Sequence, residues 1–247
     1  MKTIIISIAF VLVSLVIIST FAVSGDPVKN EVRSKVSAED MTTPIKEDFL
    51  SVRPELAALP MSDISADEKT GLLYMREEEK LARDVYTTLY QKWGVQVFAN
   101  IAQSENTHTE AMRALLEKYS ITDLVTDDTV GVFVNADLKK LYIDLTAKGL
   151  VSIEEALTVG ALIEDLDISD LERLVVVTDN EDIKLVYGNL TRGSRNHIRS
   201  FTSQLAARGM TYTATYISAD SLAQILATPR EQGTGVGHGA GNGGGRW

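Results

Sequence analysis

A glutamate and a histidine three positions apart, Glu105 and His108, are the residues of this 247-residue chain best suited to chemistry. Side chains three residues apart share one face of a helix, so a carboxylate and an imidazole at this spacing can reach the same cation. This ligand pair suits iron or manganese, and zinc less specifically. Because the motif is short and frequent by chance, its interpretation as a metal site depends on further ligands at matching positions.

Such ligands occur on the other predicted helices. Glu79 precedes His108 by 29 residues and Glu164 precedes His197 by 33, so an inward glutamate is followed twice by an inward histidine on the next helix. A carboxylate in an apolar core is costly unless something compensates its charge. Asp167 lies one turn after Glu164 and is a further candidate oxygen ligand. The predicted metal ligands are Glu79, Glu105, His108, Glu164, His197 and Asp167, and no catalytic residue is assigned.

A purely structural interpretation of these residues remains open. The acids could form a salt-bridged polar layer that Arg83 or Arg195 neutralises. Asp167 could instead cap the helix segment that follows it. Glu77 and Glu78, next to the candidate ligand on the first long helix, are expected on a solvated face. Tyrosines on the inward faces, Tyr86 and Tyr187, are expected to be core aromatics rather than redox partners.

The elements that position these residues are predicted to be helices, because residues 61–228 contain no proline. A capping box from Ser65 to Glu68 begins the first long helix and Gly94 ends it. The other expected helices cover about 97–119, 137–148, 152–177 with a break and restart at 167–170, 180–208, and a short one from Ser218 to near Pro229. This order predicts an all-α fold, a four-helix bundle of two helical hairpins joined by a long crossover.

The remaining segments differ in composition from this domain. Residues 1–24 contain an apolar run with one charge and a small-x-small sequence before Gly25, which indicates a cleaved signal peptide or a retained N-terminal membrane anchor. Residues 25–62 hold four of the five prolines and are expected to be a flexible linker. Residues 63–209 are the predicted bundle. Residues 210–231 form a C-terminal extension, extended at 210–217, and residues 232–247 a glycine-rich disordered tail.

The composition excludes several classes of protein. The absence of cysteine rules out disulfides, thiolate nucleophiles, cysteine-based zinc sites and iron–sulfur clusters. A net charge of −10 argues against a nucleic-acid partner. No nucleotide-binding glycine loop occurs within the folded part, the glycine tail lacks the flanking strand and helix of such a loop, and no Gly-x-Ser-x-Gly turn is present. The apolar N-terminal segment leads us to expect an exported chain, either secreted or anchored at the outer face of the cytoplasmic membrane.

The motifs together resemble the ferritin-like di-iron carboxylate superfamily. Glu79-x-x-Ala82-x-x-x-Tyr86 is similar to the first-helix pattern of rubrerythrins and bacterioferritins, and Glu105-x-x-His108 to their second-helix motif. Longer runs, 77–86, 163–171 and 192–197, are similar to a ferritin-like family catalogued as domain of unknown function 2202. The resemblance covers residues 62–217, nearly all of the folded part.

One position departs from the superfamily pattern. The fourth helix should carry Glu-x-x-His, but Ser194 stands three residues before His197. Asp167 is the candidate for the missing oxygen ligand, because some superfamily members use a second carboxylate there. Without such a ligand the site would hold one metal, two metals with additional water ligands, or none.

The resemblance implies iron, dinuclear where the ligand set suffices, with manganese or zinc as alternatives. It implies oxidation of ferrous iron by oxygen or peroxide, that is, an oxidoreductase of the ferroxidase or peroxidase type. The competing hypothesis is a cell-surface helical scaffold or interaction module with a degenerate metal site and no catalysis. A homodimer is compatible with the sequence, and a membrane partner is expected only through an uncleaved N-terminal segment.

Overall fold

The structure is a computed structural model that describes residue 56 and residues 58–232. Six helices and no strand occur in this part of the chain, as the sequence predicts for an all-α fold. The predicted signal peptide or anchor, most of the linker and nearly all of the glycine-rich tail lie outside the described residues. Among the described helices, none is long and apolar enough to cross a membrane.

The first long helix, α4 (Ala66–Trp93), has the predicted ends. The Glu68 amide donates to the Ser65 hydroxyl over 3.2 Å, and the Ser65 amide donates to the Glu68 carboxylate over 2.8 Å. This capping box satisfies amides that have no partner within the helix. Gly94 ends the helix in the left-handed region, with φ at 66°, where a residue without a Cβ carries no steric penalty.

The other predicted helices are also present. They are α5 (Gln96–Lys118), α6 (Ala136–Gly149), α7 (Ile153–Val177), α8 (Glu181–Ala206) and α9 (Ala219–Ala227). The predicted break at 167–170 is wrong, since α7 runs through it without interruption. Asp167 accepts a hydrogen bond from Ser194 and Asp170 pairs with Arg173, so neither carboxylate caps a new segment.

The segment 210–217, which was expected to be extended, forms no strand. Its polar groups turn to one buried carboxylate instead. Asp165 accepts from the amides of Thr215, Tyr216 and Ile217 and from the hydroxyl of Tyr212. These four bonds tie the C-terminal extension to α7 and give its backbone the partners that a strand neighbour would supply.

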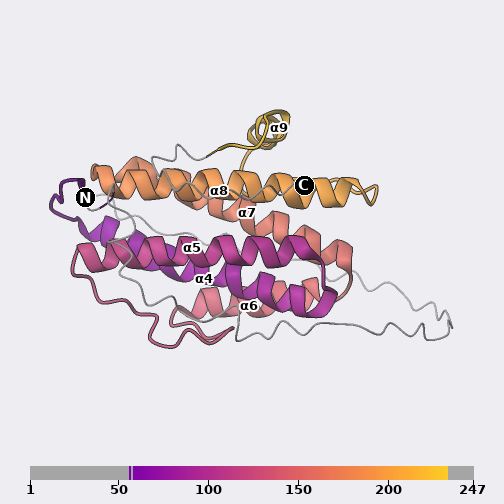
Figure 1. The fold of residues 1–247 in the computed structure, drawn as a ribbon, viewed down its shortest axis with the longest axis horizontal. Coiled ribbons are helices and arrows are strands. Elements are labelled where there is room, and N and C mark those ends of the chain that lie inside the picture. Colours follow the sequence, from indigo (N-terminus) through magenta and orange to yellow (C-terminus); the bar gives the residue numbers. More distant parts are fainter. Residues whose placement is uncertain (1–55, 57, 233–247) are drawn as a thin grey trace, which may run out of the picture. The chain divides into compact units, whose positions relative to one another are not determined.

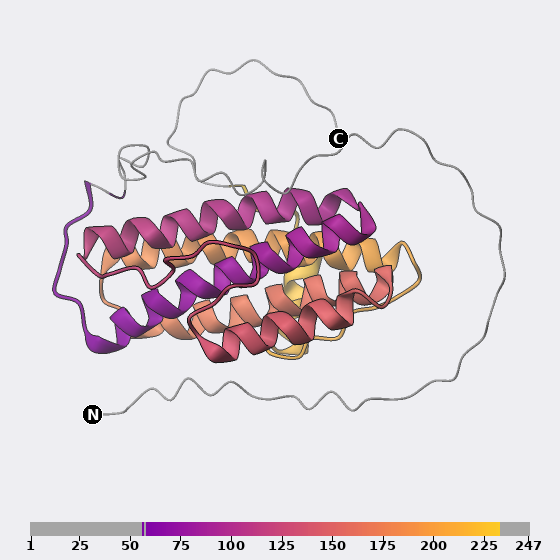
Figure 2. The same ribbon diagram turned by 90° about the horizontal axis from the view of Figure 1, so that it is seen from below.

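The four long helices lie side by side as two helical hairpins (Figures 1 and 2). Helix α4 packs mainly on α5, and helix α7 packs mainly on α8. The two hairpins meet where α4 contacts α7 and where α5 contacts α8. The connection between the hairpins is long and contains α6, which packs on α4 and α7. Rings of Tyr86, Phe98 and Phe201 from three of these helices meet in the core, with centroids 5.2–6.4 Å apart.

The long connection covers one side of α4 and buries charges there. Glu77 accepts from the amides of Val134 and Asn135, at 2.6 and 2.9 Å. Lys80 pairs with Asp84 at 2.6 Å, and both side chains are fully buried. The expectation that Glu77 and Glu78 lie on a solvated face is therefore wrong, because both are buried.

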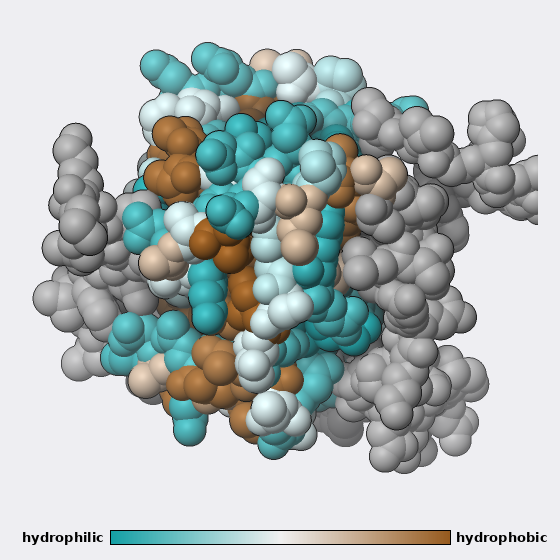
Figure 3. Space-filling model, turned by 90° about the vertical axis from the view of Figure 1, so that its left-hand side faces the viewer, coloured by the Kyte–Doolittle hydropathy of each residue, from teal (hydrophilic) through white to brown (hydrophobic). Residues whose placement is uncertain are grey.

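The end of this helical unit at which α4 begins and α5 finishes presents a mixed surface, with hydrophobic patches between hydrophilic residues (Figure 3). Val176, the most exposed large hydrophobic residue of the described chain, lies near the end of α7. Buried polar and ionisable side chains are concentrated between the four long helices, where they interrupt the apolar core.

Candidate metal centre

Glu105, on α5, is the centre of the polar group between the helices. One of its oxygens lies 2.7 Å from Nδ1 of His108, and its other oxygen lies 2.7 Å from Nδ1 of His197. The same His108 nitrogen is 3.2 Å from Glu79 on α4, and the His197 nitrogen is 3.4 Å from Glu164 on α7. The structure thus brings together five of the six residues predicted to bind metal, one or two from each long helix.

These five residues form two ligand groups that share one member. Glu79, Glu105 and His108 make the first group, and Glu105, Glu164 and His197 make the second. Within each group the potential ligand atoms lie within 4.8 Å of one another. The two imidazole rings are stacked, with centroids 5.7 Å apart. A carboxylate shared between two such groups is an arrangement suited to two neighbouring cations.

Several of these atoms lack hydrogen-bond partners in the described structure, although they are buried. Among them are Oε1 of Glu79, Oε1 of Glu105 and Nδ1 of His197. The last two lie only 2.7 Å apart, but their mutual angle is not that of a hydrogen bond. Buried polar atoms without partners are rare in proteins and call for an explanation. Lone pairs that point toward a common third position, where a cation would lie, provide one.

Ser104 controls the orientation of one histidine. Its hydroxyl lies 3.0 Å from Nε2 of His197. When Nε2 carries the proton and donates it to Ser104, the lone pair of Nδ1 is free to bind a metal. Sequence reasoning missed this residue, because its contact with His197 spans 93 positions. Its place directly before Glu105 gives no local signal of that contact.

Asp167 is placed beside the two ligand groups but belongs to neither. One of its oxygens accepts a hydrogen bond from Ser194, the residue that stands where the superfamily pattern has a glutamate. The other oxygen is buried and has no partner in the described chain. The serine of α8 therefore holds a carboxylate of α7 at the position where the chain departs from the pattern, and leaves one oxygen of Asp167 available.

Tyr86 is a core aromatic that also contacts a candidate ligand. It is fully buried among core rings, as expected. Its hydroxyl also donates to Oε1 of Glu164 over 2.5 Å and lies 3.2 Å from the Gly160 carbonyl. The tyrosine thus fixes one oxygen of a candidate ligand and leaves the other oxygen directed toward His197. Tyr187 is buried as well, and its hydroxyl has no partner in the part described.

The candidate ligands shift one another's proton affinity. Burial opposes the charged form of His197, but the carboxylates of Glu105 and Glu164 outweigh it and raise the pKa to about 10. His108 behaves in the same way beside Glu105 and Glu79, and its pKa is well above the usual range. Burial raises the pKa of Glu79 to about 7 despite the opposing effect of His108.

The remaining acids show the same competition. Burial opposes ionisation of Glu105, but the two histidines outweigh it and lower its pKa. Burial and the charge of Glu105 raise the pKa of Glu164. Burial, followed by Glu79 and Glu164, raises the pKa of Asp167 well above its usual range. Protons therefore balance the charge of this centre when no other cation does so.

The alternative interpretation, in which Arg83 or Arg195 neutralises the acids of this centre, is wrong for both arginines. Arg83 pairs with Asp84 and Asp128, and Arg195 pairs with Glu231. In the described residues, no lysine or arginine forms an ion pair with Glu79, Glu105, Glu164 or Asp167. The basic groups that pair with the three glutamates there are the two imidazoles.

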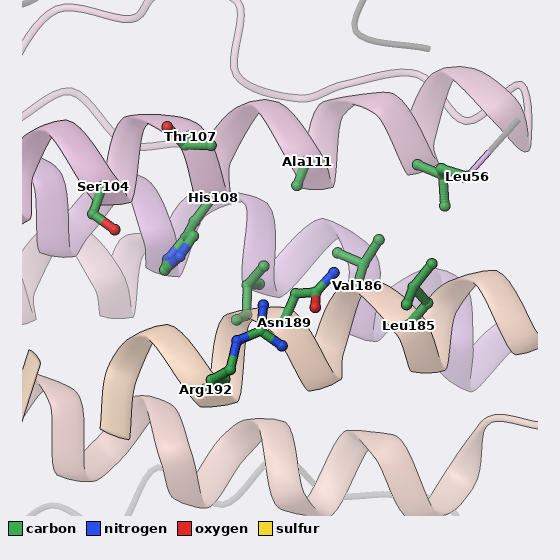
Figure 4. Close-up of a pocket in the computed structure, with 10 residues that line it drawn as sticks. Leu56, Ser104, Thr107, His108, Ala111, Leu185, Val186, Asn189 and Arg192 are labelled. Carbon is green, nitrogen blue, oxygen red and sulfur yellow. The ribbon is translucent and has the colours of Figure 1, made fainter. Parts of the chain in front are cut away.

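A pocket between α5 and α8 reaches the centre from the surface (Figure 4). Its cavity volume is about 190 Å³, and Ser104 and His108 are part of its wall. Gly193 lies against His108, since a Cβ at that position would come within 2.6 Å of Cε1 and 2.7 Å of Nε2. Sequence reasoning missed this contact, although a glycine inside a long helix is a sign of close approach.

Comparison with known proteins gives a family but no activity. Residues 68–229 match the model of an uncharacterised protein domain, DUF2202. The chain is 54% identical over 178 residues to the uncharacterised protein MJ0754 of Methanocaldococcus jannaschii, across 72% of this chain and 96% of the relative. The crystal structure of the hypothetical protein MJ0754 is 55% identical, has a TM-score of 0.70, and is matched over 70% of this chain and 99% of that one.

Proposed function

The chain belongs to the DUF2202 family of uncharacterised domains, and we propose that it is an exported ferritin-like metalloprotein with a dinuclear site, with iron as its metal. In this proposal the four long helices are a ferritin-like four-helix bundle. The observation that carries the proposal is Glu105, whose two oxygens face two different histidines at 2.7 Å. The apolar N-terminal run supports export.

The donor set fits a pair of divalent cations. Four buried carboxylates, from Glu79, Glu105, Glu164 and Asp167, would balance the charge of two such ions. Oxygen and imidazole donors without thiolates favour iron or manganese, and accept zinc. When bound, a pair of irons would supply the redox chemistry for oxidation of ferrous iron by oxygen or peroxide. The chain's own residues would hold the ions, exclude bulk water and release protons.

Each residue has a distinct task in this proposal. Glu79 with His108 would hold one ion, Glu164 with His197 the other, and Glu105 both. The histidines would give up the protons that their raised pKa values retain in the metal-free protein, since a metal requires the neutral imidazole. Ser104, Tyr86 and Ser194 would act through the ligands that they orient.

A second candidate function rests on Ser194. Because α8 lacks the glutamate of the superfamily motif, the protein could keep the fold as a cell-surface scaffold or interaction module without metal chemistry. The competing observation is the buried oxygen of Asp167 that has no partner in the described chain, because it would supply the missing carboxylate. Metal content separates the two functions directly.

The test is the metal content of the full chain, purified without a metal-affinity tag and reconstituted anaerobically with ferrous iron. We expect about two irons per chain, lost in Glu105→Ala. The matched control is Glu117→Ala on the same helix, whose side chain is half exposed and pairs with Arg113. No iron in the unaltered chain, with unchanged stability in a chelator, would favour the scaffold. Metal-dependent oxygen consumption would exclude it.

A further inference from the structure

The pocket between α5 and α8 is divided into a polar end and an apolar end. Figure 4 shows His108 and Arg192 toward one end, and Ala111, Leu185 and Leu56 toward the other. The polar end lies beside the candidate metal centre, because His108 contributes to both. This separation of polar and apolar residues suits an amphiphilic molecule whose polar head group lies next to the candidate metal centre.

Arg192 is the arginine that lines this pocket, and it has no ion pair or hydrogen bond among the residues that the structure describes. Other arginines of the same helix do have partners: Arg195 and Arg199 both pair with Glu231. In Figure 4 the Arg192 side chain extends from α8 into the space facing α5, next to Asn189. An unpaired guanidinium in a pocket is suited to an anion, and its fork geometry matches a carboxylate.

The apolar end sets the rest of the ligand. Leu56 is 2% exposed and closes this end, and its carbonyl accepts from Lys118 over 3.0 Å. The cavity volume of about 190 Å³ is somewhat larger than the roughly 150 Å³ of a cavity that binds benzene. A body of about five or six carbon atoms therefore fits inside the pocket.

We propose that this pocket binds a small monocarboxylate with a compact apolar body, with its carboxylate on Arg192 beside His108 and its body toward Leu56. This proposal rests on the proposed function in one respect, namely that the bound carboxylate lies next to a metal centre. The interaction with Arg192 requires no metal. The positive charge of Arg192 favours an anion over a free cation in this pocket.

Calorimetric titration of the full chain with hexanoate tests the proposal, in both the metal-free and the iron-loaded protein. We expect saturable binding of one hexanoate per chain, and at least about tenfold weaker binding in Arg192→Gln, as for loss of a charged hydrogen bond. Arg192→Lys should retain part of the affinity. Arg208→Gln is the control, because the exposed Arg208 side chain hydrogen-bonds to Gln204 and lies beyond the end of α8.

Three further titrations define the ligand. Acetate and hexanol should each bind at least about tenfold more weakly than hexanoate, because one lacks the apolar body and the other the charge. Inorganic phosphate should not compete with hexanoate. Equal binding of hexanol or phosphate, unchanged affinity in Arg192→Gln, or no hexanoate binding in either form of the protein would overturn the proposal.

Failure of this proposal can be told from failure of the proposed function. Iron binding without hexanoate binding would leave the metal centre and remove the carboxylate pocket. Hexanoate binding that depends on Arg192, in a chain that takes up no iron, would keep the pocket and remove the metalloprotein. The two measurements use the same preparation, so misfolding is detected in both at once.

Discussion

Gly193→Ala should prevent binding of one of the two proposed metal ions. The Cβ of alanine would come within 2.6 Å of Cε1 of His108, whereas an ordinary contact begins at 3.4 Å, so this edge of the ring must move by about 0.8 Å. Nδ1 is bonded directly to Cε1 and moves with it. Metal–ligand distances tolerate deviations of only about 0.2 Å. The group of Glu79, Glu105 and His108 should lose its ion.

Gly188→Ala is the matched control on the same helix, because a Cβ there would meet no atom within 4 Å. Both substitutions gain up to about 1 kcal/mol of helix propensity. Only Gly193→Ala also pays for overpacking, which costs roughly 1–3 kcal/mol. Urea unfolding of the metal-free variants should therefore show Gly193→Ala less stable than Gly188→Ala by about that amount.

The assay for the metal is equilibrium dialysis against ferrous iron without oxygen, followed by mass spectrometry of the metal content. We expect about two irons in Gly188→Ala and about one in Gly193→Ala. Two irons bound with unchanged affinity in Gly193→Ala would refute the assignment of His108 as a ligand. Equal stability of the two metal-free variants would refute the packing argument, whatever the metal content.

Three other outcomes are expected. Tyr86→Phe should lower the free energy of unfolding by about 1–3 kcal/mol, because it leaves an oxygen of Glu164 buried without its hydrogen-bond donor. An unchanged midpoint of thermal unfolding would contradict this. Glu78→Gln should change the stability little at pH 4 and increase it at pH 7 and above, because burial and neighbouring acids hold the pKa of Glu78 in the folded protein well above its usual range; unchanged stability at pH 7 would count against this. The metal-free protein should lose stability on the order of 3 kcal/mol as the pH rises from about 4.5 to 7, because the pKa of Glu79 in the folded protein is raised to about 7. It should lose more between about pH 6.5 and 10, because His197 gives up its proton in this range. Urea unfolding at pH 5, 7 and 9 measures this, and a stability that rises with pH would contradict the prediction.

The helices could be predicted from the sequence because their end signals are local. Ser65 and Glu68 are three residues apart, and Gly94 directly follows the last helical residue. The convergence of the five candidate ligands was also predictable, since helical periodicity fixes which side chains share a face. The break at 167–170 was predicted wrongly because an aspartate that caps a helix and one that bonds another helix look alike in a sequence. Only the contact of Asp167 with Ser194 separates them.

Contacts between segments far apart in the chain account for the rest of the site. The bond from Ser104 to His197 spans 93 residues, and the bond from Tyr86 to Glu164 spans 78. No periodicity within one helix reports which residue of another helix lies opposite. The pocket and its unpaired Arg192 could not be predicted for the same reason. An unpaired arginine is recognised only once the positions of all the acids around it are known.

The three consecutive glutamates of α4 have different environments and therefore different interactions. Successive side chains on a helix point about 100° apart, so Glu77, Glu78 and Glu79 face three different neighbours. The first holds the amides of the long connection, and the third meets His108 in the centre. Glu78 lies between them, 2% exposed and without a hydrogen-bond partner among the described residues. Because α4 is enclosed on all three of these sides, its charges have to be matched by protons, amides or a metal. Of the three glutamates, only Glu79 lies beside a histidine, His108, and the shared carboxylate of Glu105, and this restricts the proposed metal chemistry to one face of α4.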